Sequence, residues 1–386
     1  MKDVVIVDAV RTPVGKRNGC LSEIHALELG SYVLNGLFAR TQLDAKLVDF
    51  VFWGCVSQVG EQANNIGRQT WLHAGLPLEV PASTIDTQCG SSQQALNLAF
   101  GMIASGQHEI VIVGGTESMS RVPMGSNFKN GPGTPTPPTF LERYPVTHQG
   151  DSAEMIAKQW GISRAEADAY SLESHRRADH ATQCGYFERE IIPIDTVNEV
   201  GDPIHVKADE GIRPDTSLEK LANLKPVFRE DGIVTAGNAS QISDGSAALL
   251  LMSAEKAKAL GLRPLARIVA QTLVGVDPVL MLTGPIPATK SVLEKARLSL
   301  QEIDFIEINE AFASVVLAWQ REYDPDMTKV NPHGGAIALG HPLGATGAKL
   351  MTTLVHSLIT HDKQFGLQTM CCGGGLGTGT IIERLN

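Results

Sequence analysis

The feature that most constrains the fold is an alternation of short apolar runs with longer helix-like stretches, an order typical of a sheet covered by helices. The runs are continuously apolar, which indicates strands buried on both faces. We therefore predict an α/β fold with a largely parallel sheet. In the first part of the chain, strands and helices are predicted at residues 4–9, 24–37, 48–53, 61–73, 83–87, 91–104 and 109–113.

The same order of elements recurs toward the C-terminus. Two segments, 48–51 and 303–306, read Val-Asp-Phe-Val and Ile-Asp-Phe-Ile. We interpret this recurrence as a duplicated α/β unit. The later strands and helices are predicted at residues 266–274, 287–296, 303–308, 310–320, 344–358, 365–371 and 379–384.

A different region separates the two halves. It opens with the Gly/Pro-rich stretch 130–138, which cannot form regular helix or strand. A helix start is predicted at Ser163, because Glu166 follows at capping-box spacing. Long insertions of this kind usually carry binding function. The predicted domains are an N-terminal half (1–119, completed by about 241–265), an inserted loop domain (120–240) and a C-terminal half (266–386).

Charge and hydropathy restrict partners and location. With 32 basic and 42 acidic residues the net charge is −10, which argues against nucleic acid or an anionic membrane as partner. A locally basic pocket for an anionic small molecule stays compatible with it. The longest apolar run, 247–252, is too short to span a bilayer, and the N-terminus is not built like a signal peptide. We expect a cytoplasmic protein with free thiols.

Six cysteines are present, and none forms a C-x-x-C pair, so no metal site is expected. Cys89 follows a predicted strand and precedes Gly90 and a helical pattern. Backbone N–H groups and the helix dipole at such a position favour a thiolate, which would make Cys89 a nucleophile. The alternative interpretation is a buried Cys that fills space beside Gly90.

His341 lies in a loop in which four glycines (334, 335, 340 and 344) flank it. Glycine permits unusual backbone angles and the close approach of a ligand. At the mouth of the following helix, His341 could act as a base for a thiol, although a lone His is often structural. His333 in the same loop lacks this setting and is expected to be structural.

Reactive or polar side chains also lie at the ends of two further predicted strands. Cys371 and Cys372 end a buried strand that breaks into Gly373, Gly374 and Gly375, whose N–H groups could bind an oxyanion. Either thiol could shuttle a proton, since side chains alternate faces along a strand. Asn309 is a helix cap or a polar group aimed into a site. Because strand ends converge in an α/β sheet, these groups and Cys89 point to acyl transfer through a thioester.

Taken together and in this order, five passages make the chain resemble the thiolase family over essentially its whole length. The resemblance implies a duplicated five-layered αβαβα core with an inserted loop domain. It also implies CoA-dependent cleavage of a 3-oxoacyl-CoA into acetyl-CoA and a shortened acyl-CoA. The passages are Cys89-Gly90-Ser91, Gly237-Asn238-Ala239-Ser240, Asn309-Glu310-Ala311-Phe312, Gly340-His341-Pro342-x-Gly344 and Cys371-x-Gly373-Gly374-Gly375.

The resemblance implies a role for each catalytic position. Cys89 resembles the nucleophile that carries the acyl group, and His341 the base that activates it. Cys371 resembles the second acid/base, whereas Cys372 falls on the x position and is expected to be structural. Asn309 resembles a residue that holds a water, which forms one oxyanion hole with His341. The N–H groups of Cys89 and Gly373 would form the other.

The resemblance further implies acyl-CoA and CoA as partners, with CoA as co-substrate and no permanently bound cofactor. It suggests a homodimer or a homotetramer. The CoA path is expected to be lined by Ser240, Arg213, Phe228, His148, Ala311 and Phe312.

Substrate and direction are less constrained. The stretch 58–66 and the pair Gln93-Gln94 look similar to thiolases of bacterial steroid degradation, and loop 123–146 is expected to select the acyl chain. A degradative thiolase of fatty-acid or steroid side-chain β-oxidation is the leading prediction. A biosynthetic acetyl-CoA acetyltransferase would use the same residues. Ketosynthases lack the second thiol, and a non-catalytic acyl-CoA or lipid-binding relative would be expected to lack Cys89 or His341.

Overall fold

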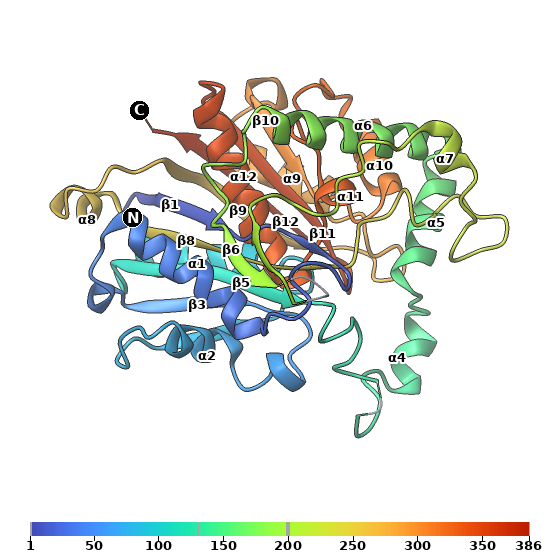
Figure 1. Cartoon of the computed structure of the whole chain (residues 1–386). Coiled ribbons are helices and arrows are strands. Elements are labelled where there is room, and N and C mark those ends of the chain that lie inside the picture. Colours follow the sequence, from blue (N-terminus) through green and yellow to red (C-terminus); the bar gives the residue numbers. More distant parts are fainter. Residues whose placement is uncertain (1, 130, 198–200, 386) are drawn as a thin grey trace.

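A computed structural model describes residues 2–129, 131–197 and 201–385 (Figure 1). Its strands are β1 (Val4–Arg11), β2 (Gly15–Lys16), β3 (Phe50–Gly54), β4 (Ala82–Ile85), β5 (Ile110–Ser118), β6 (Ile194–Val197), β7 (Pro203–Val206), β8 (Ser243–Ser253), β9 (Ala266–Gly275), β10 (Phe305–Ile308), β11 (Phe365–Cys372) and β12 (Leu376–Arg384).

The helices that cover these strands come from all parts of the chain. They are α1 (Ala26–Thr41), α2 (Ile66–His73), α3 (Ser91–Ala104), α4 (Pro138–Arg143), α5 (Gln149–Gln159), α6 (Arg164–Gln183), α7 (Leu218–Ala222), α8 (Ala254–Ala259), α9 (Pro285–Ala296), α10 (Ala313–Tyr323), α11 (Ala336–Leu339) and α12 (Thr346–Thr360). Short 3₁₀ helices are η1 (Ala45–Leu47), η2 (Gly60–Gln62), η3 (Leu300–Glu302) and η4 (Leu343–Ala345).

In the described part of the chain, one continuous sheet runs in the order β10-β11-β12-β9-β1-β8-β5-β3-β4. Its two halves meet at β1 and β9, where only Val5 and Ile6 pair with Arg267 and Ala266. Within this path β3 pairs in parallel with β4 and β5, and β10 with β11; the other neighbours are antiparallel. The prediction of a largely parallel sheet is therefore wrong, because continuous apolar runs report burial on both faces and not strand direction.

The elements stack in five layers, as predicted. Helices α3 and α12 pack against each other and against both halves of the sheet, so they form the middle layer. Helices α1 and α2 cover the outer face of the first half, and α9 and α10 cover the outer face of the second. This arrangement brings loops from both halves to the ends of the buried helix pair.

The duplication is visible in equivalent hydrogen bonds. Asp49 Oδ2 accepts from the backbone N–H groups of residues 109 and 110, at 2.7 and 2.9 Å. Asp304 Oδ2 accepts in the same way from those of residues 364 and 365, both at 2.9 Å. Each Asp follows a 3₁₀ helix and leads into a strand whose parallel neighbour begins at those N–H groups. The similarity of segments 48–51 and 303–306 thus reflects one local structure used twice.

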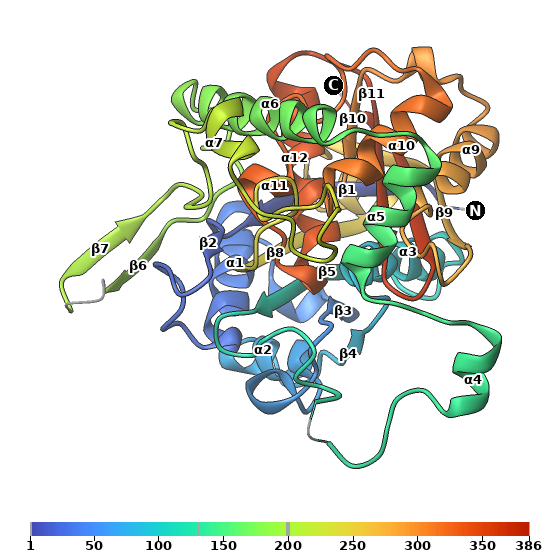
Figure 2. The ribbon, with the colours of Figure 1, turned by 90° about the vertical axis from the view of Figure 1, so that its right-hand side faces the viewer.

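The described part of the inserted region contains the helices α4, α5, α6 and α7. Helix α6 begins after Ser163, whose side chain and that of Glu166 form the predicted reciprocal capping box. Helix α5 precedes it, and both pack against α10. Helix α4 extends away from the body of the molecule on an arm, and the β6–β7 hairpin projects on another side (Figure 2).

A buried ion-pair network ties the inserted region to the first strand. Arg11 Nη1 and Nη2 donate to the Asp209 carboxylate at 2.6 and 2.9 Å, and Arg11 Nε donates to Glu190 at 2.6 Å. Glu190 also accepts from Thr353 of α12 at 3.0 Å. All four side chains are buried. The network therefore fixes both ends of residues 190–209 to the core.

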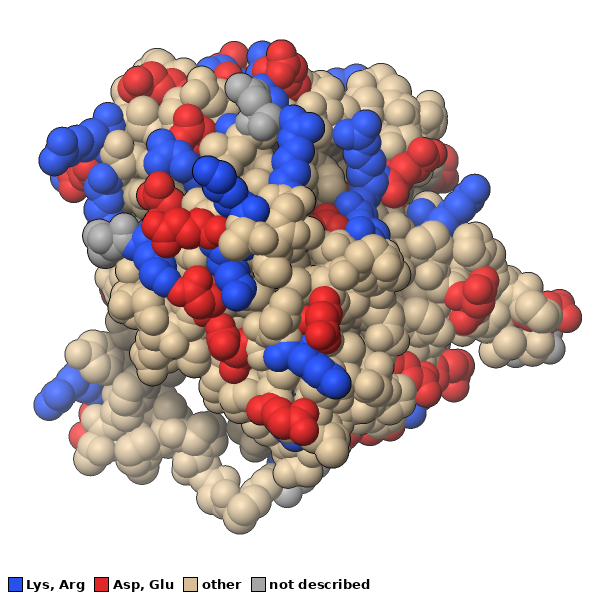
Figure 3. Space-filling model, turned by 90° about the vertical axis from the view of Figure 1, so that its left-hand side faces the viewer, with Lys and Arg blue, Asp and Glu red and all other residues tan. Residues whose placement is uncertain are grey.

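The surface carries both signs of charge. Figure 3 shows Lys and Arg interspersed with Asp and Glu on the face that it displays. Within the described residues, none of the helices is long and apolar enough to cross a membrane. The same residues contain no group of three or more His, Cys, Asp or Glu placed to hold a metal ion.

Candidate active site

Cys89 lies in a tight turn between β4 and α3. Gln88 before it adopts a left-handed conformation with φ 52°, and Gly90 after it is the N-cap of α3. A Cβ atom at Gly90 would lie 2.6 Å from Cys372 Sγ, so only glycine fits here without displacing β11. The turn therefore holds the Cys89 thiol against the end of β11.

The thiol of Cys89 is protonated at neutral pH. Burial raises its pKa to about 11, and the backbone N–H groups of Gly373 and of Cys89 itself oppose this shift. These N–H groups favour the thiolate, as expected, but burial has the larger effect on the pKa of Cys89. A base is consequently needed to deprotonate Cys89.

His341 is a suitable base in its protonation state. His341 lies between α11 and η4, so it is not at the end of a strand. Gly340 before it has φ 91°. Burial, together with the nearby Lys349 ammonium, lowers the pKa of His341 to about 3, so the imidazole is neutral at pH 7. Nδ1 lies 2.6 Å from Thr346 Oγ1, and Nε2 lies 3.4 Å from Asn309 Nδ2. With Nδ1–H donating to Thr346, Nε2 is the acceptor nitrogen and receives the N–H of Asn309 Nδ2.

Asn309 is buried beside this imidazole and does not cap a helix. Helix α10 begins at Ala313 with Phe312 as its N-cap, so the helix-cap interpretation is wrong. Asn309 Oδ1 has no hydrogen-bond partner among the described residues. A buried amide oxygen without a partner is costly in a folded protein, which favours a role toward a ligand or a water molecule.

The adjacent thiols of Cys371 and Cys372 face opposite sides of β11. Cys371 packs with Ala311 and Phe312, whereas Cys372 packs in the apolar cluster that contains Cys89. Burial raises the pKa of both thiols, and the proximity of Cys89 raises it further. The alternation along the strand thus separates two residues that sequence chemistry could not tell apart.

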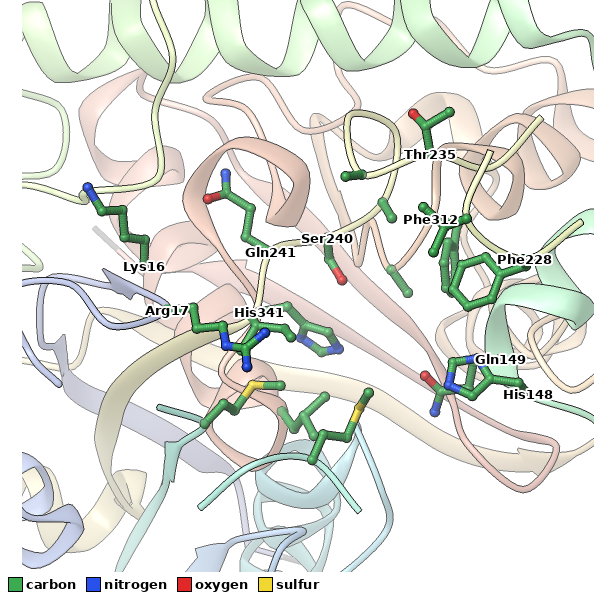
Figure 4. A pocket seen from close by; sticks show the side chains of 18 of the residues that line it. Lys16, Arg17, His148, Gln149, Phe228, Thr235, Ser240, Gln241, Phe312 and His341 are labelled. Carbon is green, nitrogen blue, oxygen red and sulfur yellow. The ribbon is translucent and has the colours of Figure 1, made fainter. Parts of the chain in front are cut away.

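One cavity of about 460 Å³ opens beside His341 (Figure 4). His341 lines it, as do all six residues expected on the CoA path: Ser240, Arg213, Phe228, His148, Ala311 and Phe312. The rings of His148 and Phe228 stack at 5.1 Å, and Phe228 meets Phe312 edge-on at 6.2 Å. These aromatic faces suit a flat or apolar ligand segment.

The other catalytic candidates are not part of the cavity lining. Among the described residues, Cys89, Cys371, Asn309 and Gly373 do not line it. Leu343 and Met119 connect the two, since they line the cavity and pack with Cys89. Among the hydrogen bonds of the described residues, none joins Cys89 to His341. Catalytic contacts of this kind often tighten only when substrate binds.

Sequence reasoning missed several residues of the site. Thr346 orients His341, and the buried Glu117 carboxylate accepts from the N–H groups of Gly344, Val56 and Ser57 at 2.9, 2.9 and 3.0 Å. Neither position stands in a motif that signals such a role. Lys16 and Arg17 also line the cavity, and their only sequence signal is a basic pair next to a turn.

Comparisons with known proteins agree over the whole chain. Residues 4–255 match the thiolase N-terminal domain, and residues 262–384 match the thiolase C-terminal domain. A steroid 3-ketoacyl-CoA thiolase of Mycobacterium tuberculosis is 50% identical over 393 residues, covering 100% of this chain and 95% of its own length. A 3-ketoacyl-CoA thiolase of Marinobacter nauticus is 43% identical, covering 100% and 99%.

Relatives named for acetyl transfer are similarly close. An acetyl-CoA acetyltransferase of Pseudomonas aeruginosa is 44% identical, covering 100% of both chains. The crystal structure of the Bacillus anthracis acetyl-CoA acetyltransferase superposes with a TM-score of 0.92 at 41% identity, covering 100% of this chain and 99% of that one. With two matching domain models and relatives of this length, the chain belongs to the thiolase family.

Proposed function

We propose that this protein is a degradative thiolase, which cleaves a 3-oxoacyl-CoA with CoA into acetyl-CoA and a shortened acyl-CoA. The observation that carries the proposal is the neutral imidazole of His341, whose Nε2 lies 3.4 Å from Asn309 Nδ2 at the wall of the cavity that the six expected CoA residues line. Relatives named 3-ketoacyl-CoA thiolase support it.

In the first half-reaction, Cys89 transfers its proton to His341 Nε2, and the sulfur attacks the 3-keto carbon. The N–H groups of Cys89 and Gly373, which already act on this sulfur, stabilise the alkoxide. Collapse of the alkoxide breaks the C2–C3 bond and leaves the acyl group on Cys89. Protonated His341 and a water held by Asn309 stabilise the departing enolate, and Cys371 protonates its C2 to give acetyl-CoA.

In the second half-reaction, the Cys371 thiolate takes the thiol proton of CoA. The CoA sulfur attacks the acyl-Cys89 carbonyl, and the same two N–H groups stabilise the new alkoxide. Cys89 leaves as a thiolate and regains its proton from His341. Every group thereby returns to its starting protonation state, with Cys371 serving as acid and then as base.

The cavity supports a specific path for CoA. Arg213 is exposed at its mouth, and its guanidinium has no hydrogen bond or ion pair with a described residue, so it is available for a phosphate or for stacking on adenine. His148, Phe228 and Phe312 would flank the pantetheine chain, and Ser240, Ala311 would complete the wall. We propose CoA as a co-substrate, with no permanently bound cofactor.

The acyl group of the substrate and the direction of the reaction, cleavage or condensation, belong to the same proposal. The relative from M. tuberculosis, named for steroids, supports a bulky steroid-derived or branched acyl group. Relatives named acetyl-CoA acetyltransferase support the alternative of condensing two acetyl-CoA with the same residues. Of loop 123–146, Met124 lines the cavity while helix α4 extends away from it, so Met124 is the candidate selector on this loop.

We also propose a homodimer or a homotetramer in the cytoplasm. The arm that carries α4 exposes large apolar side chains, which a second copy of the chain could cover: Phe128, Phe140, Leu141 and Tyr144. Free thiols at all six cysteines fit a reducing compartment. We retain the predicted domains as part of this proposal: 1–119 completed by about 241–265, 120–240 and 266–386.

The decisive experiment combines product analysis with mass spectrometry. The protein is incubated with short, branched and steroid-derived 3-oxoacyl-CoAs plus CoA. Acetyl-CoA should form, and an acyl adduct should map to Cys89. Cys89→Ala should abolish both. Cys371→Ala should abolish turnover, whereas the matched Cys372→Ala should retain most of it. Absence of acetyl-CoA and of any adduct would refute the proposal.

A further inference from the structure

The loop after β2 presents an arginine without a partner to the cavity. The guanidinium of Arg17 makes no hydrogen bond or ion pair with any residue that the structure describes. Figure 4 shows this side chain extended toward His341, and both residues line the same cavity. A guanidinium has five N–H donors in a planar fork, which matches the geometry of a carboxylate or a phosphate.

The backbone around Arg17 is firmly held. The N–H groups of Lys16 and Cys20 donate to Glu210 Oε2 at 3.1 and 3.0 Å, and that of Asn18 donates to Ser120 Oγ at 2.8 Å. Every neighbour of Arg17 is thus anchored while its own side chain is free. A ligand that meets the guanidinium therefore needs to order only one side chain, which favours binding.

The charge of the cavity wall is opposite to that of the whole chain. Of the described residues that line it, three are cations (Lys16, Arg17 and Arg213) and none is Asp or Glu, although the net charge of the chain is −10. Lys16 is paired with Glu210 at 3.2 Å. Arg17 and Arg213 are left as two unpaired cations. CoA carries three phosphate groups and could meet both, so the position of Arg17 in the cavity decides which anion it binds.

The position of Arg17 indicates which part of the substrate carries that anion. The backbone N–H of Asn18 donates a hydrogen bond to Ser120 Oγ. Met119, which precedes Ser120, packs in the apolar cluster that contains Cys89 and Leu343. His148 and Phe228, on the proposed CoA path, lie on the other side of His341 from Arg17 (Figure 4). The anion that Arg17 meets would therefore belong to the acyl chain near Cys89.

We propose that Arg17 binds a carboxylate carried by the acyl chain, so that the preferred substrate is a 3-oxoacyl-CoA with a second acid group. This inference rests on the proposed thiolytic function and names the substrate class for it. A bidentate guanidinium–carboxylate contact supplies orientation as well as affinity. It would fix the acyl chain from its far end while Cys89 attacks C3.

The test compares substrates of equal carbon number with and without the second acid. Thiolysis is measured for 3-oxohexanedioyl-CoA against 3-oxohexanoyl-CoA, and for the eight- and ten-carbon pairs. The wild type is expected to have the higher kcat/KM for at least one diacid. Arg17→Gln should lower the diacid-to-monoacid ratio about tenfold or more, and Arg17→Lys should restore part of it. The matched control Arg213→Gln should lower both rates and leave the ratio unchanged.

Two results would overturn the inference. An equal loss for both substrates in Arg17→Gln would mean that Arg17 contacts a CoA phosphate. A wild-type preference for the monoacid at every chain length would also exclude a carboxylate subsite. In both cases thiolysis itself would persist, whereas absence of acetyl-CoA from every substrate would overturn the proposed function as well.

Discussion

At the scale of single residues, the site depends on opposite effects of burial on two groups. Burial holds the Cys89 thiol protonated, with a pKa of about 11, and holds His341 neutral, with a pKa of about 3. A thiolate–imidazolium pair is therefore disfavoured before substrate arrives. The negative charge is expected to form only as the acyl carbon is attacked, where Gly373 and Cys89 N–H groups can stabilise it.

Asn309→Ala tests the second oxyanion site. The variant removes the amide beside His341 Nε2, and kcat is expected to fall about 10²- to 10³-fold, as is typical for the loss of one such donor. KM should change little, because the group acts on charge that develops during the reaction. Steady-state thiolysis measures both constants. A rise in KM with unchanged kcat would show that Asn309 acts in ground-state binding instead.

His333→Asn tests a buried histidine outside the reaction. His333 Nε2 lies 3.0 Å from His361 Nε2, and burial lowers the pKa of His333 to about 4. The folded pKa of His333 lies below the unfolded value of about 6.5. Above pH 6.5 the imidazole is neutral in both states, so His333 does not make the free energy of unfolding depend on pH. As the pH falls from 6.5 toward 4, the unfolded state takes up a proton that the folded state does not, and the fold is destabilised. At pH 5 the cost is about 2 kcal/mol of unfolding free energy.

Urea unfolding at pH 7.5 and pH 5 measures this effect. The loss of stability between the two values should be smaller in His333→Asn than in the wild type. His205→Asn, on the exposed β6–β7 hairpin, is the matched control and should behave as the wild type. Equal pH dependence in all three proteins would contradict the assignment.

At the scale of elements, the start of α3 is fitted against the end of β11. Gly90→Ala would place a Cβ 2.6 Å from Cys372 Sγ, so the turn that holds Cys89 must move. We expect a large loss of kcat together with a loss of about 1–3 kcal/mol in unfolding free energy. The double variant Gly90→Ala/Cys372→Ala should recover part of the loss, because it removes the clashing sulfur. Lack of any recovery would show that the clash is with β12 at Thr378, 3.0 Å away.

At the scale of the whole molecule, the inserted region is anchored by Arg11. Arg11→Met would leave the carboxylates of Asp209 and Glu190 buried without their partner, at a cost of about 3–5 kcal/mol in unfolding free energy. Arg176→Met, which breaks an exposed pair with Glu173, should cost at most about 1 kcal/mol. Chemical denaturation compares the two, and similar small losses would contradict a structural role for the buried network.

Sequence reasoning reached the architecture and the motifs but not strand direction or protonation. The duplicated Asp-Phe segments and the capping box at Ser163 are local signals, so they were predictable. The antiparallel β8 depends on how the chain returns from the insertion, which no local pattern encodes. The pKa of Cys89 depends on burial by residues distant in the sequence, and this outweighed the helix start. Arg17 had no motif, since its environment is set by Glu210 and Ser120.

The narrow contact between β1 and β9 has a consequence for the history of such a chain. The two layered units share only two residue pairs in the sheet and meet mainly through α3, α12 and η4, so they retain separate identities within one polypeptide. In the fused chain the two copies are free to specialise. In the proposed reaction the first copy would supply the sulfur at Cys89, and the second would supply His341, Asn309 and Cys371. An asymmetric reaction would thus be carried out by two similar units that contribute different groups.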